Sequence, residues 1–408
     1  MKNHLFLSGL LLFSLPVISQ QKAIGNRTQL IAKTDSILNN QVERKLIPGA
    51  VIQIKIGNEI VTTKAYGYAN AYSFIGQPLE NPERMTTAHM FDIASLTKVV
   101  GTTTAIMLLV DKGRLSIDDL VGKYISDFTS TDKKDITITH LLTHTSGLHD
   151  WYPMYYRSNN RQSTYKLIGS LPLKYPVGKE RHYSDLGFTI LGQIIETISG
   201  MPLEEYVDKN IFQPLGMKSS TYNPIKKGFT SFAATSHGNP YEKRMVYDSS
   251  LGYQFPEIKH DSWNSWRQYT LRGEVNDGNA WYANGGVSGA AGLFSTISDI
   301  QRLVDMLLNK GRVGNKQFIS EKTVTAFLRK NQFLNGLGWM MDPANSFMKG
   351  APEGSFGHTG FTGTSIAVIP SEKMSIILLI NRQNTGLNVK GEYYSLNGLR
   401  AEIFRIWR

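Results

Sequence analysis

The chain contains no cysteine among its 408 residues. This absence excludes disulfide bonds, a thiol nucleophile and lipid attachment through cysteine. Apart from an apolar stretch at the N-terminus, no segment is long and apolar enough to predict a membrane-spanning helix. The sequence also lacks internal repeats and low-complexity linkers. These absences favour a globular protein whose chemistry depends on residues other than cysteine.

Several common site motifs are missing as well. No Gly-x-Ser-x-Gly elbow occurs, which disfavours an α/β-hydrolase. The glycines between Gly285 and Gly292 lack the lysine of a phosphate-binding loop, so no nucleotide site is indicated. His140 and His144 have the spacing of helical metal ligands, but no third ligand lies near them, and a role in helix packing is favoured. We therefore expect neither a cofactor nor a metal ion.

Acidic residues are outnumbered by basic ones, 33 to 44, which gives a formal net charge of +11. The basic residues are scattered along the chain, as on an ordinary solvated surface. The positive balance favours anionic surroundings such as cell-wall polymers or membrane surfaces. Nucleic acid is not an expected partner, because the N-terminus predicts export.

The N-terminal segment has the layout of a signal peptide. A short basic start is followed by a mostly apolar stretch from Leu5 to Ile18, and a plausible cleavage site follows Ser19. The stretch is short for a membrane span, although an uncleaved anchor is the alternative. We expect a periplasmic or secreted protein without an integral membrane domain. The sequence does not indicate an oligomeric state.

An activated nucleophile is indicated by Ser95-Leu96-Thr97-Lys98, which precedes an apolar segment suited to a buried helix. Residues three apart share one face of a helix, so the hydroxyl and the amine lie side by side. Serine is a poor nucleophile unless a neighbouring group takes its proton, and a serine-lysine pair provides this without histidine. Alone, the tetrapeptide also fits a helix cap followed by a solvated lysine.

Two further motifs follow in the chain. Tyr183-Ser184-Asp185 precedes a predicted helix from Leu186 to Ile198 that ends at Gly200. The segment 357–363, Gly-His-Thr-Gly-Phe-Thr-Gly, leads into a strand that we expect to pair with residues 374–380 as a hairpin. Glycines at a strand start allow a substrate to lie close to the backbone.

Together these motifs resemble those of the β-lactamase and penicillin-binding-protein superfamily of serine hydrolases. The similarity is to the branch of class C β-lactamases, D-alanyl-D-alanine carboxypeptidases and related esterases. The segments 136–148 and 285–295 also resemble family blocks, so the resemblance covers about residues 30–408. It implies an α/β (α+β) fold, in which an antiparallel sheet is flanked by helices and carries an inserted, mainly helical region.

The resemblance also implies roles for individual residues. Ser95 would attack a carbonyl, while Lys98 and Tyr183 would exchange its proton. The backbone N–H groups of Ser95 and Phe361 would form the oxyanion hole, in which each donor typically contributes about 3 to 4 kcal/mol. The implied substrate-binding residues are Asp185, His358, Thr359 and Gly360.

Asp185 departs from the family pattern, which usually has asparagine at this position. An ionised carboxylate offers no hydrogen-bond donor to a substrate amide. We expect it to pair with Lys98 and to favour the charged lysine, which shifts the role of general base toward Tyr183. The lost donor also weakens the β-lactamase interpretation.

The three motifs must converge, so we expect residues 20–408 to form a single catalytic domain. Its α/β part would comprise about residues 23–98 and 293–408, and residues 99–292 would supply the helical part. Within the latter, residues 223–284 are irregular and rich in aromatic residues. Such a long irregular segment suggests a functional loop, whose aromatics either contact substrate or pack the insert onto the body.

We interpret the chain as an exported serine hydrolase that forms an acyl-enzyme at Ser95 on an amide or ester. The expected activity is D-alanyl-D-alanine carboxypeptidase-like or esterase-like, with a small-molecule or peptidoglycan-like substrate. The alternatives are a class C-like β-lactamase and a non-catalytic protein that binds penicillin or senses cell-wall fragments.

Overall fold

The computed structural model describes residues 15–129, 132–342 and 346–408. Residues 1–14 of the expected signal peptide lie outside these described residues. The first described element is helix α1 (Leu15–Glu43), which runs through the expected cleavage point after Ser19. The cleavage itself stays a prediction.

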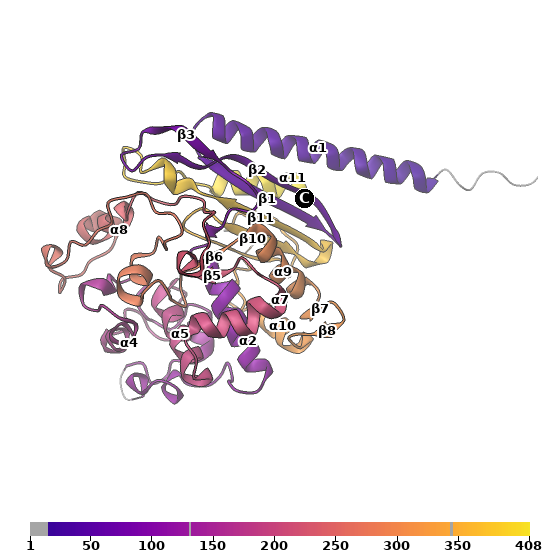
Figure 1. The fold of residues 1–408 in the computed structure, drawn as a ribbon. Coiled ribbons are helices and arrows are strands. Elements are labelled where there is room, and N and C mark those ends of the chain that lie inside the picture. The colour runs from indigo at the N-terminus through magenta and orange to yellow at the C-terminus, as the bar shows by residue number, and fades with distance from the viewer. Residues whose placement is uncertain (1–14, 130–131, 343–345) are drawn as a thin grey trace, which may run out of the picture.

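The centre of the fold is a six-stranded antiparallel sheet drawn from both ends of the chain (Figure 1). The strand order is β3-β2-β1-β11-β10-β9. The bounds are β1 (Gly49–Ile56), β2 (Glu59–Tyr72), β3 (Pro78–Arg84), β9 (Phe356–Thr359), β10 (Ser365–Ile369) and β11 (Met374–Ile380). β1 pairs directly with β11, and β10 with β11 forms the hairpin that the sequence predicted.

The central strands are buried on both faces. In β1, Ala50 and Ile52 pack into the apolar cluster on one face of the sheet, whereas Val51 packs into the cluster on the other. Successive side chains of a strand point to opposite faces, so both faces of β1 are covered. The same double burial explains the apolar run at residues 376–380 of β11.

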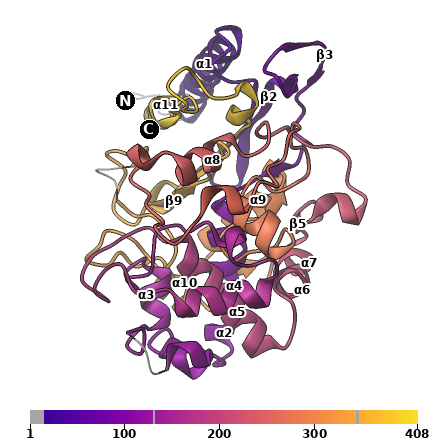
Figure 2. The ribbon, with the colours of Figure 1, turned by 90° about the vertical axis from the view of Figure 1, so that its left-hand side faces the viewer.

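Two terminal helices cover the outer face of the sheet. α1 and α11 (Asn397–Trp407) lie together along this face (Figures 1 and 2). Leu38 of α1 is fully buried there, and the Trp407 indole N–H donates to the Thr34 hydroxyl across 2.9 Å. The N- and C-terminal ends of the fold are therefore held together by one apolar cluster.

Helices fill the space on the inner face. α9 (Ile297–Leu308) packs against β11 and β1. The remaining helices are α2 (Thr104–Asp111), α3 (Ile138–Leu142), α4 (Arg161–Ser170), α5 (Asp185–Ser199), α6 (Leu203–Val207), α7 (Gln213–Leu215), α8 (Pro240–Tyr247) and α10 (Glu321–Phe327). The predicted helix ending at Gly200 is confirmed as α5, with Gly200 in the left-handed conformation at its end. The expected fold class is thus confirmed.

Two smaller sheets complete the fold. β4 (Phe91–Asp92), β6 (Leu293–Ser295) and β5 (Thr221–Tyr222) form a three-stranded sheet in the order β4-β6-β5. A short pair consists of β7 (Arg312–Val313) and β8 (Lys316–Gln317). The three-stranded sheet matters for function, because β4 leads directly to Ser95.

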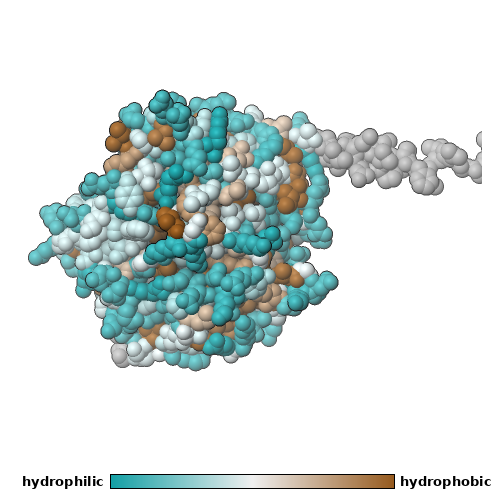
Figure 3. Space-filling model, viewed as in Figure 1, coloured by the Kyte–Doolittle hydropathy of each residue, from teal (hydrophilic) through white to brown (hydrophobic). Residues whose placement is uncertain are grey.

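The surface seen in Figure 3 is largely hydrophilic, with apolar side chains in small, separated patches. Within the part of the chain that the structure describes, no single helix has the length and apolar character to cross a membrane. α5 taken together with residues 203–215 meets that criterion, but the two segments are bent by 76°.

We predict that Leu38→Ala lowers the free energy of unfolding by about 2 to 5 kcal/mol, because it leaves a cavity between α1 and the sheet. Urea unfolding of the purified protein measures this change. The exposed Ile60 provides a matched control, and Ile60→Ala should change stability by less than about 0.5 kcal/mol. Equal effects of the two substitutions would contradict the packing of α1.

Candidate active site

Ser95 lies where β4 passes into a helix. The backbone turns sharply at Ala94, whose φ of 46° is in the left-handed region. The Asp92 carboxylate accepts the Ala94 N–H at 2.8 Å and holds this costly conformation in place. The buried helix expected after Ser95 is confirmed, but its first segment, Lys98–Thr103, is π-helical before α2 begins. Such wide turns are frequent at functional sites.

Lys98 is completely buried beside Ser95. Its Nζ lies 3.1 Å from Ser95 Oγ, 2.6 Å from Asp185 Oδ1 and 3.0 Å from the carbonyl oxygen of Ala290. A lysine ammonium has three N–H donors, so these acceptors can satisfy all of them, and the Tyr183 phenol is a fourth hydrogen-bond partner. Burial opposes the charge, but the Asp185 carboxylate and the Tyr183 phenol outweigh it and raise the pKa of Lys98 above its usual value. The arrangement therefore suits a charged lysine.

Tyr183 completes the convergence predicted from the motifs. Its phenol hydrogen bonds with the side chains of Ser95 and Lys98, and Lys98 Nζ lies 5.0 Å from the centre of its ring. Burial raises the pKa of Tyr183, while the positive charge of Lys98 acts in the opposite direction. The structure thus brings the hydroxyl, the ammonium and the phenol together.

The residues that follow Tyr183 fix its place. Ser184 is the N-cap of α5, since its hydroxyl accepts the Gly187 N–H at 3.2 Å and donates to the His149 carbonyl at 2.7 Å. Asp185 is therefore the first residue of the helix rather than its cap. From this position its carboxylate reaches Lys98.

The helix-packing role expected for the two histidines is found at His144, whose ring centre lies 5.1 Å from that of Phe188 in α5, while His140 caps α3. The ring of His140 accepts the Thr137 N–H in the capping box of α3. His144 instead follows the helix with a left-handed φ of 60° and lies against Tyr183, with the two ring centres 4.3 Å apart. The pattern of two histidines four residues apart could not show that the second leaves the helix.

His144 holds the chain on both sides of Tyr183. Its carbonyl accepts the His182 N–H at 2.9 Å, and its Nδ1 accepts the Ser184 N–H at 3.0 Å. Burial lowers the pKa of His144 well below its usual value, so the ring is neutral. Because Nδ1 is an acceptor, the ring proton is on Nε2.

The segment after β9 forms the opposite wall of the site. The hydroxyls of Thr362 and Thr364 donate to the carbonyls of Asp92 at 2.7 Å and Ile93 at 3.0 Å, respectively. A Cβ on Gly360 would lie 2.5 Å from the Ile93 carbonyl oxygen, so only glycine allows this close approach. The wall is thereby fixed to the backbone just before Ser95.

Two backbone N–H groups are free to bind an oxyanion. Both Ser95 and Phe361 line the same cavity, and within the described residues neither of their N–H groups has a hydrogen-bond acceptor. The guanidinium of Arg382 donates to the Phe361 carbonyl at 3.1 and 2.7 Å and fixes this peptide. Both N–H groups are available as donors at the cavity, and the oxyanion hole implied by the family motifs stays a prediction.

The remaining predicted substrate-binding residues divide into two groups. Asp185 lines the cavity, whereas His358, Thr359 and Gly360 do not. His358 is buried, its ring hydrogen bonds with the Thr359 carbonyl at 2.8 Å, and burial lowers its pKa to about 3. It is therefore neutral and turned into the protein. Its ring centre lies 6.1 Å from that of Tyr183, and its role in binding substrate stays a prediction.

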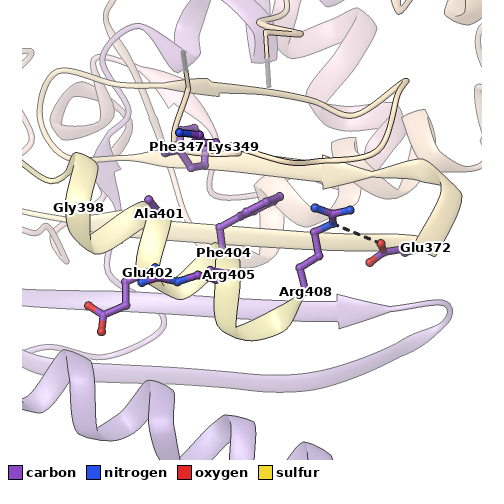
Figure 4. Close-up of a pocket in the computed structure, with 9 residues that line it drawn as sticks. All are labelled: Phe347, Lys349, Glu372, Gly398, Ala401, Glu402, Phe404, Arg405 and Arg408. Carbon is purple, nitrogen blue, oxygen red and sulfur yellow. Dashed lines mark ion pairs between the residues drawn. The ribbon is translucent and has the colours of Figure 1, made fainter. Parts of the chain in front are cut away.

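The cavity beside Ser95 has a volume of about 300 Å³. Its lining residues are Ala94, Ser95, Asp150, Trp151, Tyr183, Asp185, Tyr241, Glu242, Met245, Tyr253, Asn276, Asp277, Ala291 and Phe361. A larger cavity of about 660 Å³ lies at α11, where Arg408 pairs with Glu372 (Figure 4). Its lining residues include no serine or tyrosine. The reactive constellation therefore belongs to the smaller cavity.

The irregular segment 223–284 supplies one side of the smaller cavity. Tyr241, Glu242, Met245, Tyr253, Asn276 and Asp277 all come from it. Trp263 and Trp266, in contrast, pack against each other and against Tyr155. The sequence indicated a functional loop, but its lack of periodicity gave no signal as to which aromatic residues face the cavity.

The glycine-rich segment 285–292 has a packing role. A Cβ on Gly289 would lie 2.1 Å from the Phe188 carbonyl oxygen, so this residue must be small to approach α5. The same loop supplies the Ala290 carbonyl that accepts from Lys98. Within the described residues, no group of three or more histidine, aspartate or glutamate side chains is arranged to hold a metal ion.

Comparison with known proteins identifies the family. The family described as Beta-lactamase matches residues 34–398. The chain belongs to the beta-lactamase family. It is a beta-lactamase-family serine hydrolase, as the motifs at Ser95, Tyr183 and His358 indicated.

Relatives of this beta-lactamase-family protein carry several names. Proteins from Salmonella agona and Salmonella typhimurium, each named "Putative D-alanyl-D-alanine carboxypeptidase", are 36% identical over 94% of this chain and 92% of their own. An octameric penicillin-binding protein homologue from Pyrococcus abyssi has a TM-score of 0.67 at 22% identity, covering 93% of this chain and 78% of its own. EstCE1, a hydrolase with promiscuous acyltransferase activity, has a TM-score of 0.67 at 18% identity, covering 93% and 99%. These solved structures share the fold.

We predict that Thr364→Val lowers the free energy of unfolding by roughly 1 kcal/mol, because the Ile93 carbonyl loses one of its two donors and keeps only the Leu96 N–H. Guanidinium unfolding measures this loss. Thr129→Val removes a comparable hydroxyl at an exposed position and should cost less than about 0.5 kcal/mol. A Thr364→Val protein as stable as the parent would show that this contact does not hold the wall.

Proposed function

We propose that this beta-lactamase-family protein hydrolyses an amide or ester through an acyl-enzyme at Ser95, with D-alanyl-D-alanine carboxypeptidase-like activity. One observation carries the proposal: Ser95 Oγ and Asp185 each accept from the buried Lys98 ammonium, beside two free backbone N–H groups. The names of the Salmonella relatives support the carboxypeptidase assignment. The N-terminal segment supports a periplasmic or secreted location.

The charged state of Lys98 determines the proton path. Because it is protonated, the Lys98 ammonium has no lone pair with which to accept the serine proton. Tyr183 is the other group in contact with Ser95. Burial raises the pKa of Tyr183, so its phenolate is a minor form near pH 7, and the Lys98 ammonium stabilises that form. We therefore assign the general base to Tyr183 in its phenolate form and assign electrostatic stabilisation to Lys98.

The reaction then has two balanced steps. Ser95 Oγ bonds to the substrate carbonyl carbon and passes its proton to Tyr183, while the N–H groups of Ser95 and Phe361 bind the oxyanion. Collapse of the intermediate breaks the bond to the leaving group, which takes the proton from Tyr183. In the second step water gives its proton to Tyr183 and attacks the acyl carbon, and Ser95 recovers the proton as it departs.

A specific observation also favours an esterase-like activity. Asp185 presents a carboxylate to the cavity, where it accepts from Lys98 and offers no donor to a substrate amide. An ester with a small acyl group does not require such a donor. The same feature weighs against a class C-like β-lactamase, and the complete constellation weighs against a purely binding protein.

We predict that Ser95→Ala abolishes both covalent labelling by a fluorescent penicillin and release of D-alanine from a D-Ala-D-Ala peptide. The hydroxyl is the only proposed bond-forming atom, so activity should fall by about 10³-fold or more. Gel fluorescence and a coupled D-alanine assay provide the measurements. Ser298→Ala, on α9 away from the cavity lining, is the matched control. Equal labelling of parent and Ser95→Ala proteins would refute the proposed nucleophile.

We predict that His144→Phe lowers kcat by roughly 10-fold or more while KM changes little. The substitution removes the ring nitrogen that accepts the Ser184 N–H, so the neighbouring Tyr183 is held less precisely. Phenylalanine keeps a ring against Tyr183 but lacks Nδ1. Steady-state hydrolysis of p-nitrophenyl acetate separates the two constants. His140→Phe removes a histidine that caps α3 and should leave kcat nearly unchanged. Parallel losses in the two variants would indicate a general effect on stability.

A further inference from the structure

The cavity beside Ser95 is lined by acidic residues, although the chain as a whole is basic. The chain has a formal net charge of +11, yet four carboxylate residues and no lysine or arginine line this cavity. The four are Asp150, Asp185, Glu242 and Asp277. A general preference for anionic surroundings therefore does not extend to the reaction cavity.

Two of these carboxylates already have a cationic partner. Asp150 accepts from Lys174 Nζ at 3.1 Å, and Asp185 pairs with Lys98 at 2.6 Å. Glu242 and Asp277 differ, since among the residues that the structure describes no cation lies within ion-pair distance of either. Their carboxyl groups accept only neutral donors, including the Gly278 N–H and the Ala280 N–H, each at 2.7 Å.

Burial makes this arrangement costly. The Glu242 side chain faces the cavity although the residue is only 8% exposed. Burial, and then repulsion from Asp277, raise the pKa of Glu242, while Arg267 counteracts part of the increase. Burial, and then repulsion from Asp185, raise the pKa of Asp277, against the smaller effects of Lys98 and Arg267. Because its pKa is raised to about 8, Glu242 is mostly protonated near pH 7. An ionised buried carboxylate without a paired cation is strongly disfavoured, so a cation bound beside Glu242 and Asp277 would favour their ionised forms.

Aromatic rings on the same cavity provide a second, independent feature. Trp151, Tyr241 and Tyr253 all line it. Aromatic faces attract ammonium groups through their quadrupole, and tryptophan and tyrosine do so most strongly. Carboxylates together with aromatic rings form a suitable environment for an organic ammonium.

We propose that this cavity selects substrates whose acyl portion carries an ammonium group, which Glu242 and Asp277 bind among the aromatic rings. The inference rests on the proposed function, because it takes Ser95 as the point of attack. Asp185 does not contribute a free charge, since Lys98 already neutralises it. The cavity volume of about 300 Å³ accommodates a chain such as a lysine side chain next to the scissile carbonyl.

Binding to the Ser95→Ala protein tests the proposal without turnover. The probes are Nα-acetyl-Lys-D-Ala-D-Ala, with a free ε-ammonium, and its twin acetylated at both nitrogens. Isothermal calorimetry should show about tenfold tighter binding of the ammonium peptide. In Ser95→Ala proteins that also carry Asp277→Asn or Glu242→Gln, the preference should fall to about threefold or less. Affinity for the neutral twin should be unchanged, which reports on an intact cavity.

A matched control separates local recognition from general electrostatics. Glu321→Gln removes one negative charge from an exposed ion pair with Lys310 and should retain the full preference for the ammonium peptide. Equal affinity for the two peptides, tighter binding of the neutral twin, or no measurable binding of the ammonium peptide would each overturn the proposal. A charge preference in binding, without Ser95-dependent hydrolysis by the parent protein, would instead overturn the proposed function and leave the ammonium site standing.

Discussion

A buried ammonium is the constraint on which the site depends. Lys98 is removed from water, and its three N–H groups find acceptors on three separate parts of the chain. These are its own helix entry at Ser95, the first residue of α5 at Asp185, and the glycine-rich loop at Ala290. An unpaired buried charge would be strongly destabilising, so the charged lysine requires these acceptors to be in place around it. The same contacts place the nucleophile.

Strained backbone and close packing hold that arrangement. Ala94 and His144 adopt left-handed conformations, one directly before Ser95 and one against Tyr183. Such conformations are unfavourable by about 1 to 3 kcal/mol and persist where surrounding contacts fix them. Asp92 fixes the first and the backbone of residues 182–184 fixes the second. The free energy gained by burying the apolar clusters of the fold thus partly offsets the strain that holds the reactive groups in place.

Local sequence patterns were sufficient for much of this structure. The hairpin of β10 and β11 and the helix α5 follow from periodicity and caps, whereas the convergence of Ser95, Lys98 and Tyr183 was implied by the family resemblance. The orientation of His358 did not follow, because burial of a side chain depends on contacts from distant segments. The role of His144 was missed for the same reason. Net charge is an average over the whole surface, so it could not indicate an acidic cavity. The irregular segment 223–284 has no clear periodicity, so the sequence could not show which of its side chains face the cavity.

The most direct test of this account is the protonation state of Lys98. Nitrogen NMR of the lysine side chains, with the Lys98 signal assigned through its loss in Lys98→Gln, follows this group from about pH 6 to about pH 10. The account predicts an ammonium signal across this range, because Asp185 and Tyr183 hold the charge in place. A neutral amine near pH 7 would contradict it, since Lys98 could then take the serine proton itself and Tyr183 would not be required as the base.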